Sequence, residues 1–338
     1  MKFSDIIGQK VITESIKRAV EEGKVANAYI FHGAVGSGRK LTASIFAAAL
    51  NCKSHTGEKP CEICSSCIKQ KSGNHPDVTT IRPSGSSIKI KQIWEVISLV
   101  SKKSVEDGYK VIIFEDAEKM TDEAQNAFLK TLEEPNKDTV FILIVESLNL
   151  LLPTIQSRCQ IFNFRKLDEH SMTEYLNKVQ GFSQSQIKLA TSSADGSIGK
   201  ALKILSDDTY SKKRSESIKI ISEISNGSKV RVAFLTDSII QSRADALDFV
   251  GICTTFFRDV MIYRELDQSS EKMLLNSDAR NEIIKYSETL TNEDINCIME
   301  IINNARKQID FNVSFKNSID SMLFSIMEVH KNGKGSRY

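Results

Sequence analysis

The chain has 338 residues, which is enough for two or three domains that each bury a core. Its 45 basic and 43 acidic residues give a net charge of +2, which excludes a protein that binds nucleic acid through its overall charge. The strongest apolar runs, residues 111–114 and 141–145, are far too short to span a membrane, so we expect a cytoplasmic protein with no membrane partner and with reduced or metal-bound cysteines.

Residues 1–166 alternate short apolar strands with segments of helical length. Strands are predicted over residues 28–32, 78–82, 111–114, 140–145 and 161–164, and helices over 40–50, from 91, and over 122–132. Strands separated by helices favour a parallel sheet with helices on both faces, so the predicted fold class is α/β. Ligands of such a sheet bind at the carboxyl ends of its strands, which is where a glycine-rich segment falls.

Strand signals stop after Leu167. Helical periodicity follows, first in a small unit of three helices, then, after a polar segment (206–215) predicted as a linker, in a longer all-helical region. The predicted helices include residues 168–179, 183–194, 198–205, 244–265 and 292–309. The predicted domains are residues 1–166, with a cysteine module at 51–75, then 167–207 and 208–330, with a disordered tail at 331–338.

The glycine-rich segment 33–40 (GAVGSGRK) has the glycine spacing of a phosphate-binding loop. A working loop reads G-x-x-x-x-G-K-[ST]: backbone N–H groups surround the phosphates, the lysine neutralises them and the hydroxyl holds Mg²⁺. Gly33, Gly36 and Gly38 are present, but Arg39 takes the lysine position and Lys40 the hydroxyl position. Arg39 either holds an anion on the loop or fills the loop with its bulk. We expect little or no binding of ATP and Mg²⁺ here.

Four cysteines follow the loop helix with the spacing C-x8-C-x2-C-x2-C, at Cys52, Cys61, Cys64 and Cys67. Paired C-x2-C thiolates complete a tetrahedral structural zinc site, which would fold an insertion too short to bury a core of its own. A disulfide pair does not suit a reducing compartment, and a redox pair does not need four cysteines, but an iron–sulfur cluster has related spacing. The remaining cysteines are predicted as core residues: Cys159, Cys253 and Cys297.

An acidic pair, Glu115 and Asp116, ends the strand predicted over residues 111–114. A Walker B segment delivers an Asp to Mg²⁺ from such a strand, and a following Glu polarises the attacking water. In this chain the order is reversed. Because positioning carries most of the catalysis in phosphoryl transfer, the exchange predicts loss of hydrolysis.

Four segments together resemble the AAA+ clamp-loader family of bacterial DNA polymerase III. They are residues 27–33 (NAYIFHG) before the glycine loop, 73–78 (GNHPDV) after the cysteines, 126–135 (NAFLKTLEEP) after the acidic pair, and 152–159 (LPTIQSRC), which carries an SRC motif. The resemblance covers the first domain and the small helical unit. It implies an AAA+ P-loop domain with a zinc insertion, a helical lid and an all-α collar for oligomerisation.

Within the SRC motif, the resemblance makes Arg158, flanked by Ser157 and Cys159, an arginine finger that reaches the ATP site of a neighbouring gamma/tau subunit. Gly199 stands where the family has a sensor arginine. The resemblance therefore implies a subunit without intrinsic ATPase activity that completes a ring with gamma/tau and delta subunits. Through that ring it would meet the sliding clamp and primer-template DNA, as part of the DNA-directed DNA polymerase (nucleotidyltransferase) holoenzyme.

Two other functions fit parts of the sequence. One is an active clamp-loader ATPase in which Arg39 and Lys40 together replace the usual lysine. The other is a zinc-dependent nucleic-acid binder, which predicts salt-sensitive binding of DNA by the isolated chain. The near-neutral charge and the lack of a basic, aromatic patch argue against the second.

Overall fold

The computed structural model describes all residues except 55–56, 180, 225–228, 267–272, 312 and 336–338. The chain forms two compact units. The first contains Met1–Tyr175 and Gly196–Gly199, and the second contains Leu176–Asp195 and Lys200–Tyr338. The division predicted from the sequence, with boundaries at 166 and 207, stays a prediction.

The first unit is built on a five-stranded sheet in which every neighbouring pair is parallel, in the order β2-β3-β4-β1-β5. The strands are β1 (Ala28–Gly33), β2 (Val78–Ile81), β3 (Lys110–Phe114), β4 (Thr139–Val145) and β5 (Gln160–Phe164). All residues of β3 and β4 are buried, as expected for central strands covered on both faces. The predicted α/β fold is confirmed.

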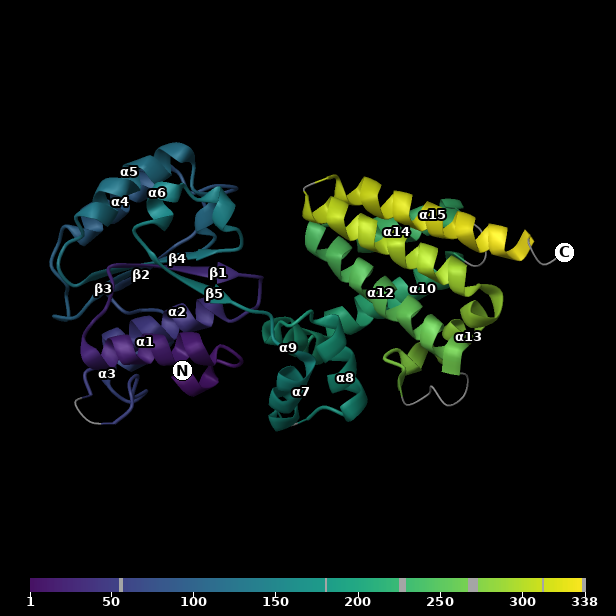
Figure 1. The fold of residues 1–338 in the computed structure, drawn as a ribbon, viewed down its shortest axis with the longest axis horizontal. Coiled ribbons are helices and arrows are strands. Elements are labelled where there is room, and N and C mark those ends of the chain that lie inside the picture. The colour runs from purple at the N-terminus through teal and green to yellow at the C-terminus, as the bar shows by residue number, and fades with distance from the viewer. Residues whose placement is uncertain (55–56, 180, 225–228, 267–272, 312, 336–338) are drawn as a thin grey trace. The chain divides into compact units, whose positions relative to one another are not determined.

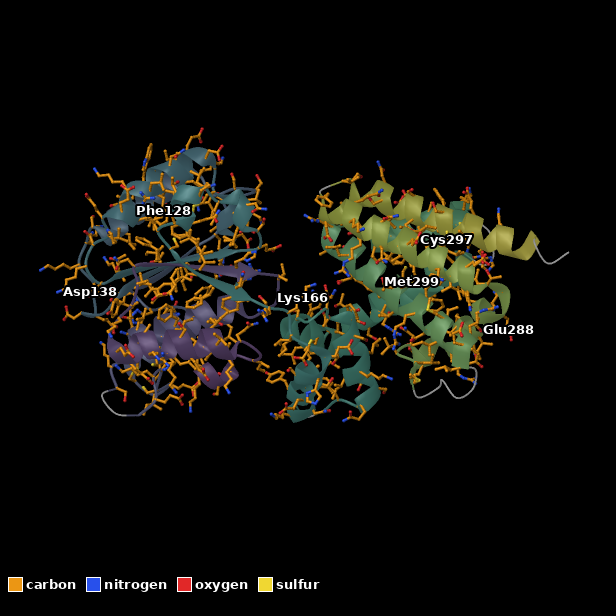
Figure 2. All side chains as sticks on the ribbon, viewed as in Figure 1. Phe128, Asp138, Lys166, Glu288, Cys297 and Met299 are labelled. Atoms are coloured by element: carbon orange, nitrogen blue, oxygen red, sulfur yellow. The ribbon has the colours of Figure 1, made fainter. Side chains whose placement is uncertain are left out.

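Helices cover both faces of this sheet (Figure 1). One layer contains α1 (Lys10–Glu22), α2 (Arg39–Leu50) and α3 (Ser65–Lys71), and the other contains α4 (Ile90–Val100), α5 (Asp122–Glu133) and α6 (Pro153–Gln156). Short 3₁₀ turns lie at Phe3–Asp5, Ala117–Lys119 and Leu148–Leu150. Side chains fill the space between each layer and the sheet (Figure 2). In the α4–α5 layer, Phe128 is fully buried, with its ring 5.1 Å from those of Phe114 and Phe141.

Among the described residues, the second unit contains helices and their connections but no strand. Two helices, α7 (Glu169–Lys178) and α9 (Ile198–Ser206), include residues of both units. The others are α8 (Gln184–Ser193), α10 (Asp208–Ile224), α11 (Lys229–Ile239), α12 (Arg243–Leu266), α13 (Arg280–Thr289), α14 (Asn292–Asp310), α15 (Phe315–Gly335) and the 3₁₀ turn η5 (Ser277–Ala279). Phe256, Phe257 and Tyr286 pack edge to face within the buried core of this unit. In the described part of the chain, no helix has both the length and the apolar composition needed to cross a membrane.

Three local predictions were wrong. The segment 206–215 is not a linker, because α10 begins at Asp208 and buries Tyr210 and Arg214 one turn apart. The predicted tail is helical as far as Gly335, where α15 ends, and residues 336–338 lie outside the described residues. Cys297 is exposed on α14 (Figure 2), whereas Cys253 is buried and Cys159 packs against the α4–α5 core as predicted.

Candidate functional site

The glycine loop joins β1 to α2 and is closely covered by other parts of the first unit. Gly33, Gly36 and Gly38 all have positive φ angles, of 155°, 80° and 93°. A Cβ atom at Gly36 would lie 1.8 Å from Oγ of Ser197, and one at Gly33 would lie 2.4 Å from the carbonyl oxygen of Phe164. The end of β5 and the segment before α9 therefore both pack against this loop.

Gln9, which the sequence did not single out, ties the glycine loop to the residue after β5. Its side chain is buried just before α1, and Nε2 donates to the carbonyl oxygens of Arg165 at 2.7 Å and Ser37 at 3.4 Å. Its Oε1 accepts the Arg165 N–H at 3.3 Å. A buried amide that uses both of its ends in this way fixes the backbones it joins.

Arg39 points into the protein at the start of α2. The residue is only 7% exposed, and Nη1 donates to the carbonyl oxygen of Val145, at the end of β4. Burial lowers the pKa of Arg39, while the nearby carboxylates of Glu146, Glu118 and Asp116 raise it. Of the two roles left open by the sequence, this geometry favours the one in which the side chain fills the site. The Arg39 guanidinium already has a protein acceptor.

Lys40 turns to the acidic pair instead. Its Nζ lies 2.6 Å from Oε2 of Glu115, and Arg82 Nη2 lies 3.1 Å from Oε1 of the same carboxylate. Burial raises the pKa of Glu115, but the hydrogen bonds from Arg82 and Lys40 outweigh it and leave the pKa lowered. Asp116 adopts a left-handed conformation (φ 53°) and pairs with Lys119 at 3.1 Å. Both acids that a magnesium ion would need are thus paired with side-chain cations.

Two further residues near this site bear on nucleotide binding. Glu118, which the sequence analysis missed, accepts the N–H of Glu146 at 3.3 Å, and burial raises its pKa. Its other oxygen, Oε2, is buried with no hydrogen-bond partner among the described residues. At Gly199, a Cβ atom would have no neighbouring atom within 4 Å, so the absence of a side chain there is not imposed by close packing at that point.

Arg158 makes no hydrogen bond or ion pair with the glycine loop within the described structure. It lies just after α6, where Nη2 is 2.6 Å from Oε1 of Glu133 at the end of α5. Nη1 donates to the carbonyl oxygen of Thr154 at 2.8 Å and approaches Oγ of Ser157 at 3.4 Å. The neighbouring Cys159 thiol has its pKa raised to about 12 by burial. Arg158 is thus an exposed guanidinium held at one edge, with Glu133 as a partner that the sequence did not reveal.

The four predicted cysteines converge. Cys52, Cys61, Cys64 and Cys67 place their Sγ atoms within 4.8 Å of one another, and Cys52 and Cys67 are buried. Ideal tetrahedral coordination with metal–sulfur bonds of about 2.3 Å separates the sulfurs by about 3.8 Å. The Sγ atoms of Cys61 and Cys67 are 4.0 Å apart, and backbone N–H groups of Cys61 and Cys64 point at Sγ of Cys52 and Cys61, each at 3.4 Å. This donor set fits one metal ion with four thiolate ligands.

Charged and buried polar groups attach the cysteine module to the sheet. Glu106 forms ion pairs with Lys53 and Lys69 of the module, which lower its pKa to about 2. The buried imidazole of His75 accepts the Asp77 N–H at Nδ1 (3.1 Å), so its Nε2–H faces Ser66 Oγ (2.9 Å). Burial lowers the pKa of His75, which keeps it neutral. None of these partners was predicted.

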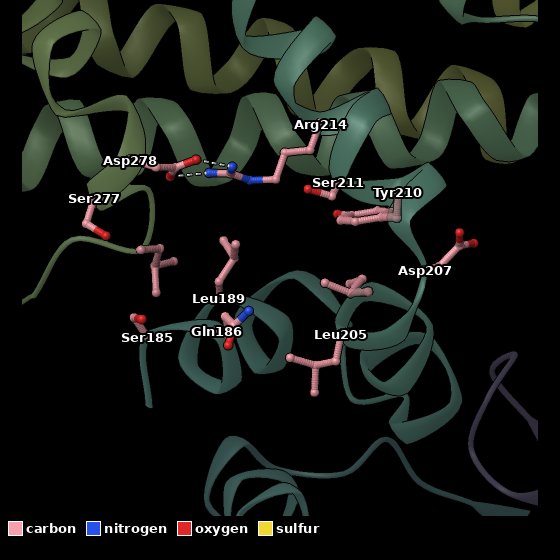
Figure 3. Close-up of a pocket in the computed structure, with 12 residues that line it drawn as sticks. Ser185, Gln186, Leu189, Leu205, Asp207, Tyr210, Ser211, Arg214, Ser277 and Asp278 are labelled. Carbon is pink, nitrogen blue, oxygen red and sulfur yellow. Dashed lines mark hydrogen bonds and ion pairs between the residues drawn. The ribbon is translucent and has the colours of Figure 1, made fainter. Parts of the chain in front are cut away.

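The second unit contains a pocket of about 350 Å³ that the sequence also did not predict (Figure 3). It lies among α8, α9, α10 and η5. Arg214 is 8% exposed and donates to both oxygens of Asp278 and, at 2.8 Å, to Oδ1 of Asn276. Beside it, burial raises the pKa of Tyr210 to about 12. Because Asp278 neutralises Arg214 within the wall, this pocket has no free cation there, and we assign it no ligand.

Comparisons with known proteins find similarity to subunits of DNA polymerase III. A family described as "DNA polymerase III, delta subunit" matches residues 8–168. The DNA polymerase III subunit delta' of Bacillus subtilis is 27% identical over 323 residues, which cover 95% of this chain and 96% of that protein. The tau subunit of the same organism is 32% identical over 60% of this chain, which spans only 37% of tau. A gamma subunit-related protein from Thermotoga maritima has the same fold, with a TM-score of 0.50 and 17% identity over 94% of this chain and 99% of that one.

Proposed function

Because this chain belongs to the family of DNA polymerase III clamp-loader subunits and has their AAA+ fold, we propose that it is the delta-prime subunit. In this role it completes the clamp-loader ring, hydrolyses no ATP itself and supplies Arg158 to the ATP site of a neighbouring gamma/tau subunit. Delta is the other subunit partner, and the assembled ring acts on the sliding clamp at primer-template DNA.

One observation carries the proposal that this subunit hydrolyses no ATP. At the glycine loop, the side chains that would contact the phosphates and the magnesium ion already pair with other groups of the protein. Arg39 donates to the Val145 carbonyl, and Lys40 and Arg82 pair with Glu115. Ser197 also lies against Gly36, on the loop that would have to receive phosphates. Hydrolysis requires phosphates and metal to be held in precise alignment, and none of these groups is free to hold them.

The role of Arg158 rests on its chemistry and exposure. A guanidinium is always charged, and its planar array of N–H donors matches the oxygens of a phosphate. Arg158 is exposed, and its Nε–H has no partner among the described residues. An arginine supplied by a neighbouring subunit meets the charge that develops on the transferring phosphoryl group, and that can accelerate hydrolysis by several orders of magnitude.

The cysteine module would hold one zinc ion as a structural element. Cys52, Cys61, Cys64 and Cys67 would supply all four ligands and leave no open position for a substrate or an activated water. The ion would fold the insertion and keep Lys53 and Lys69 in place to pair with Glu106.

The test is a clamp loader reconstituted with this subunit as wild type, Arg158→Ala or the control Arg18→Ala, which removes an exposed arginine from α1. We expect Arg158→Ala to leave assembly intact and to lower ATPase and clamp-loading rates at least about tenfold, with Arg18→Ala unchanged. Unchanged rates for Arg158→Ala would refute the finger. Steady ATP turnover by the isolated chain that Lys40→Ala abolishes and Arg158→Ala does not would instead establish an active ATPase.

A further inference from the structure

Glu133 lies at a helix position that does not favour a carboxylate. It is the last residue of α5, where the helix dipole disfavours a negative charge, and Pro135 follows two residues later. Its neighbour Glu134 is also exposed but has no ion pair or hydrogen bond through its side chain in the described structure. Glu133 instead forms the 2.6 Å ion pair with Arg158. Of these two adjacent exposed carboxylates, only Glu133 therefore pairs with Arg158 in the described structure.

The contact orients the guanidinium rather than enclosing it. Glu133 accepts an N–H of Nη2, and the Thr154 carbonyl accepts one of Nη1, so these two contacts and the covalent link to the side chain together fix the plane of the group. The Nε–H has no partner among the described residues, and the Arg158 side chain is 35% exposed. One edge of the guanidinium is therefore fixed to the protein, while the other is open to an incoming acceptor.

Both sides of the ion pair stand on rigid backbone. On the α5 side, Phe128 and Leu132 are buried in the core. The buried side chain of Gln125, also on α5, donates to the Leu150 carbonyl at 3.1 Å and accepts the Leu152 N–H at 2.8 Å, which joins α5 to the segment that leads into α6. The carboxylate and the arginine are thus held in a fixed relation by the scaffold.

We propose that Glu133 is a positioning residue for Arg158: it holds the guanidinium in the orientation in which its free Nε edge faces the neighbouring subunit's nucleotide. This rests on the proposed function of Arg158. An exposed arginine without such a partner samples many rotamers. Each time it contacts a nucleotide, it then loses side-chain conformational entropy. Holding it in advance removes that cost from the catalytic step. Because the Glu133 side chain is 48% exposed, the pair is weak enough for small adjustments when a phosphate arrives.

The experiment compares Glu133→Gln with Glu134→Gln in the reconstituted complex, with Arg158→Ala and the double variant Glu133→Gln/Arg158→Ala alongside. Each of the two glutamine variants removes one charge from the same exposed turn, but only the first touches the finger. We expect Glu133→Gln to lower kcat for ATP hydrolysis about three- to tenfold with KM within about twofold, and Glu134→Gln to leave both unchanged. The double variant should be no slower than Arg158→Ala alone, because the two residues act through one group.

Each outcome separates the two proposals. If Arg158→Ala lowers the rate but Glu133→Gln matches Glu134→Gln, positioning by Glu133 is overturned and the finger stands. A faster complex with Glu133→Gln also overturns positioning, because the carboxylate would then restrain the arginine. If Arg158→Ala has no effect, the proposed function itself fails. Equal thermal midpoints for the two glutamine variants control for folding.

Discussion

Replacing Arg39 tests whether its side chain occupies the glycine loop as a buried, hydrogen-bonded group that stabilises the first unit. Replacing it with alanine removes a hydrogen bond from a charged donor to the Val145 carbonyl, which is worth about 1.5–3 kcal/mol. Losing the three buried methylenes of the arginine stem removes up to about 2 kcal/mol more. Relief from burying a charged guanidinium, whose pKa is lowered by that burial, offsets part of this loss. We therefore expect Arg39→Ala to lower the unfolding free energy of the first unit by about 2–3 kcal/mol.

Lys40→Ala is the matched control. Its side chain is 59% exposed, so the ion pair with Glu115 contributes less than about 1 kcal/mol, and Arg82 still neutralises the carboxylate. The chain has a single tryptophan, Trp94 on α4, so urea unfolding followed by tryptophan fluorescence reports on the first unit alone. Midpoints should be compared at equal m-values.

Two results would refute this reasoning about Arg39. If Arg39→Ala and Lys40→Ala shift the midpoint equally, Arg39 does not act as a buried, bonded group. If Arg39→Ala stabilises the first unit, the free-energy cost of burying the guanidinium exceeds the stabilisation that its contacts provide.

Two further predictions concern the metal and the second unit. Purified chain should contain one zinc ion that protects four of seven thiols, and chelation should expose all four and lower the Trp94 unfolding midpoint; iron, or no metal, in elemental analysis would contradict this. Burial raises the pKa of Asp278, but the hydrogen bonds from Arg214 outweigh it and leave the folded pKa below its ordinary value. A lowered folded pKa stabilises the protein above the ordinary pKa of an aspartate, about 3.9, and this stabilisation is lost as the pH falls through the folded pKa. Amide protection in α10, corrected for the intrinsic exchange rate at each pH, should therefore fall below about pH 4 in wild type but change less in Asp278→Asn; identical pH profiles would refute this.

Local patterns were enough to predict the sheet and most helices. The strand near residue 141 was visible because all of β4 is apolar or Thr, and its burial on both faces requires that composition. The cysteine site was predictable for a similar reason, since its ligand spacing lies within sixteen residues.

The errors arose where a residue's partner is distant in sequence. Segment 206–215 looked like a linker because it is polar, yet Arg214 is buried by a pair with Asp278, 64 residues away. The same holds for Arg39 and Val145, which are 106 residues apart, so the sequence left two roles for Arg39 open. Cys297 is different, because its exposure was open to prediction: the buried positions of α14, such as Ile295, Ile298 and Ile302, follow a helical period that excludes it.

The exposure of Cys297 makes the second unit chemically addressable. Among the cysteines, only Cys297 on α14 is exposed, whereas Cys253 is buried, Cys159 is partly buried and the other four converge on one candidate metal site, so a maleimide dye would react most readily at Cys297. Trp94 is a fixed fluorophore in the first unit. Energy transfer between Trp94 and a dye at Cys297 would therefore measure the separation of the two units. The measurement could be made on the free chain and on the reconstituted complex.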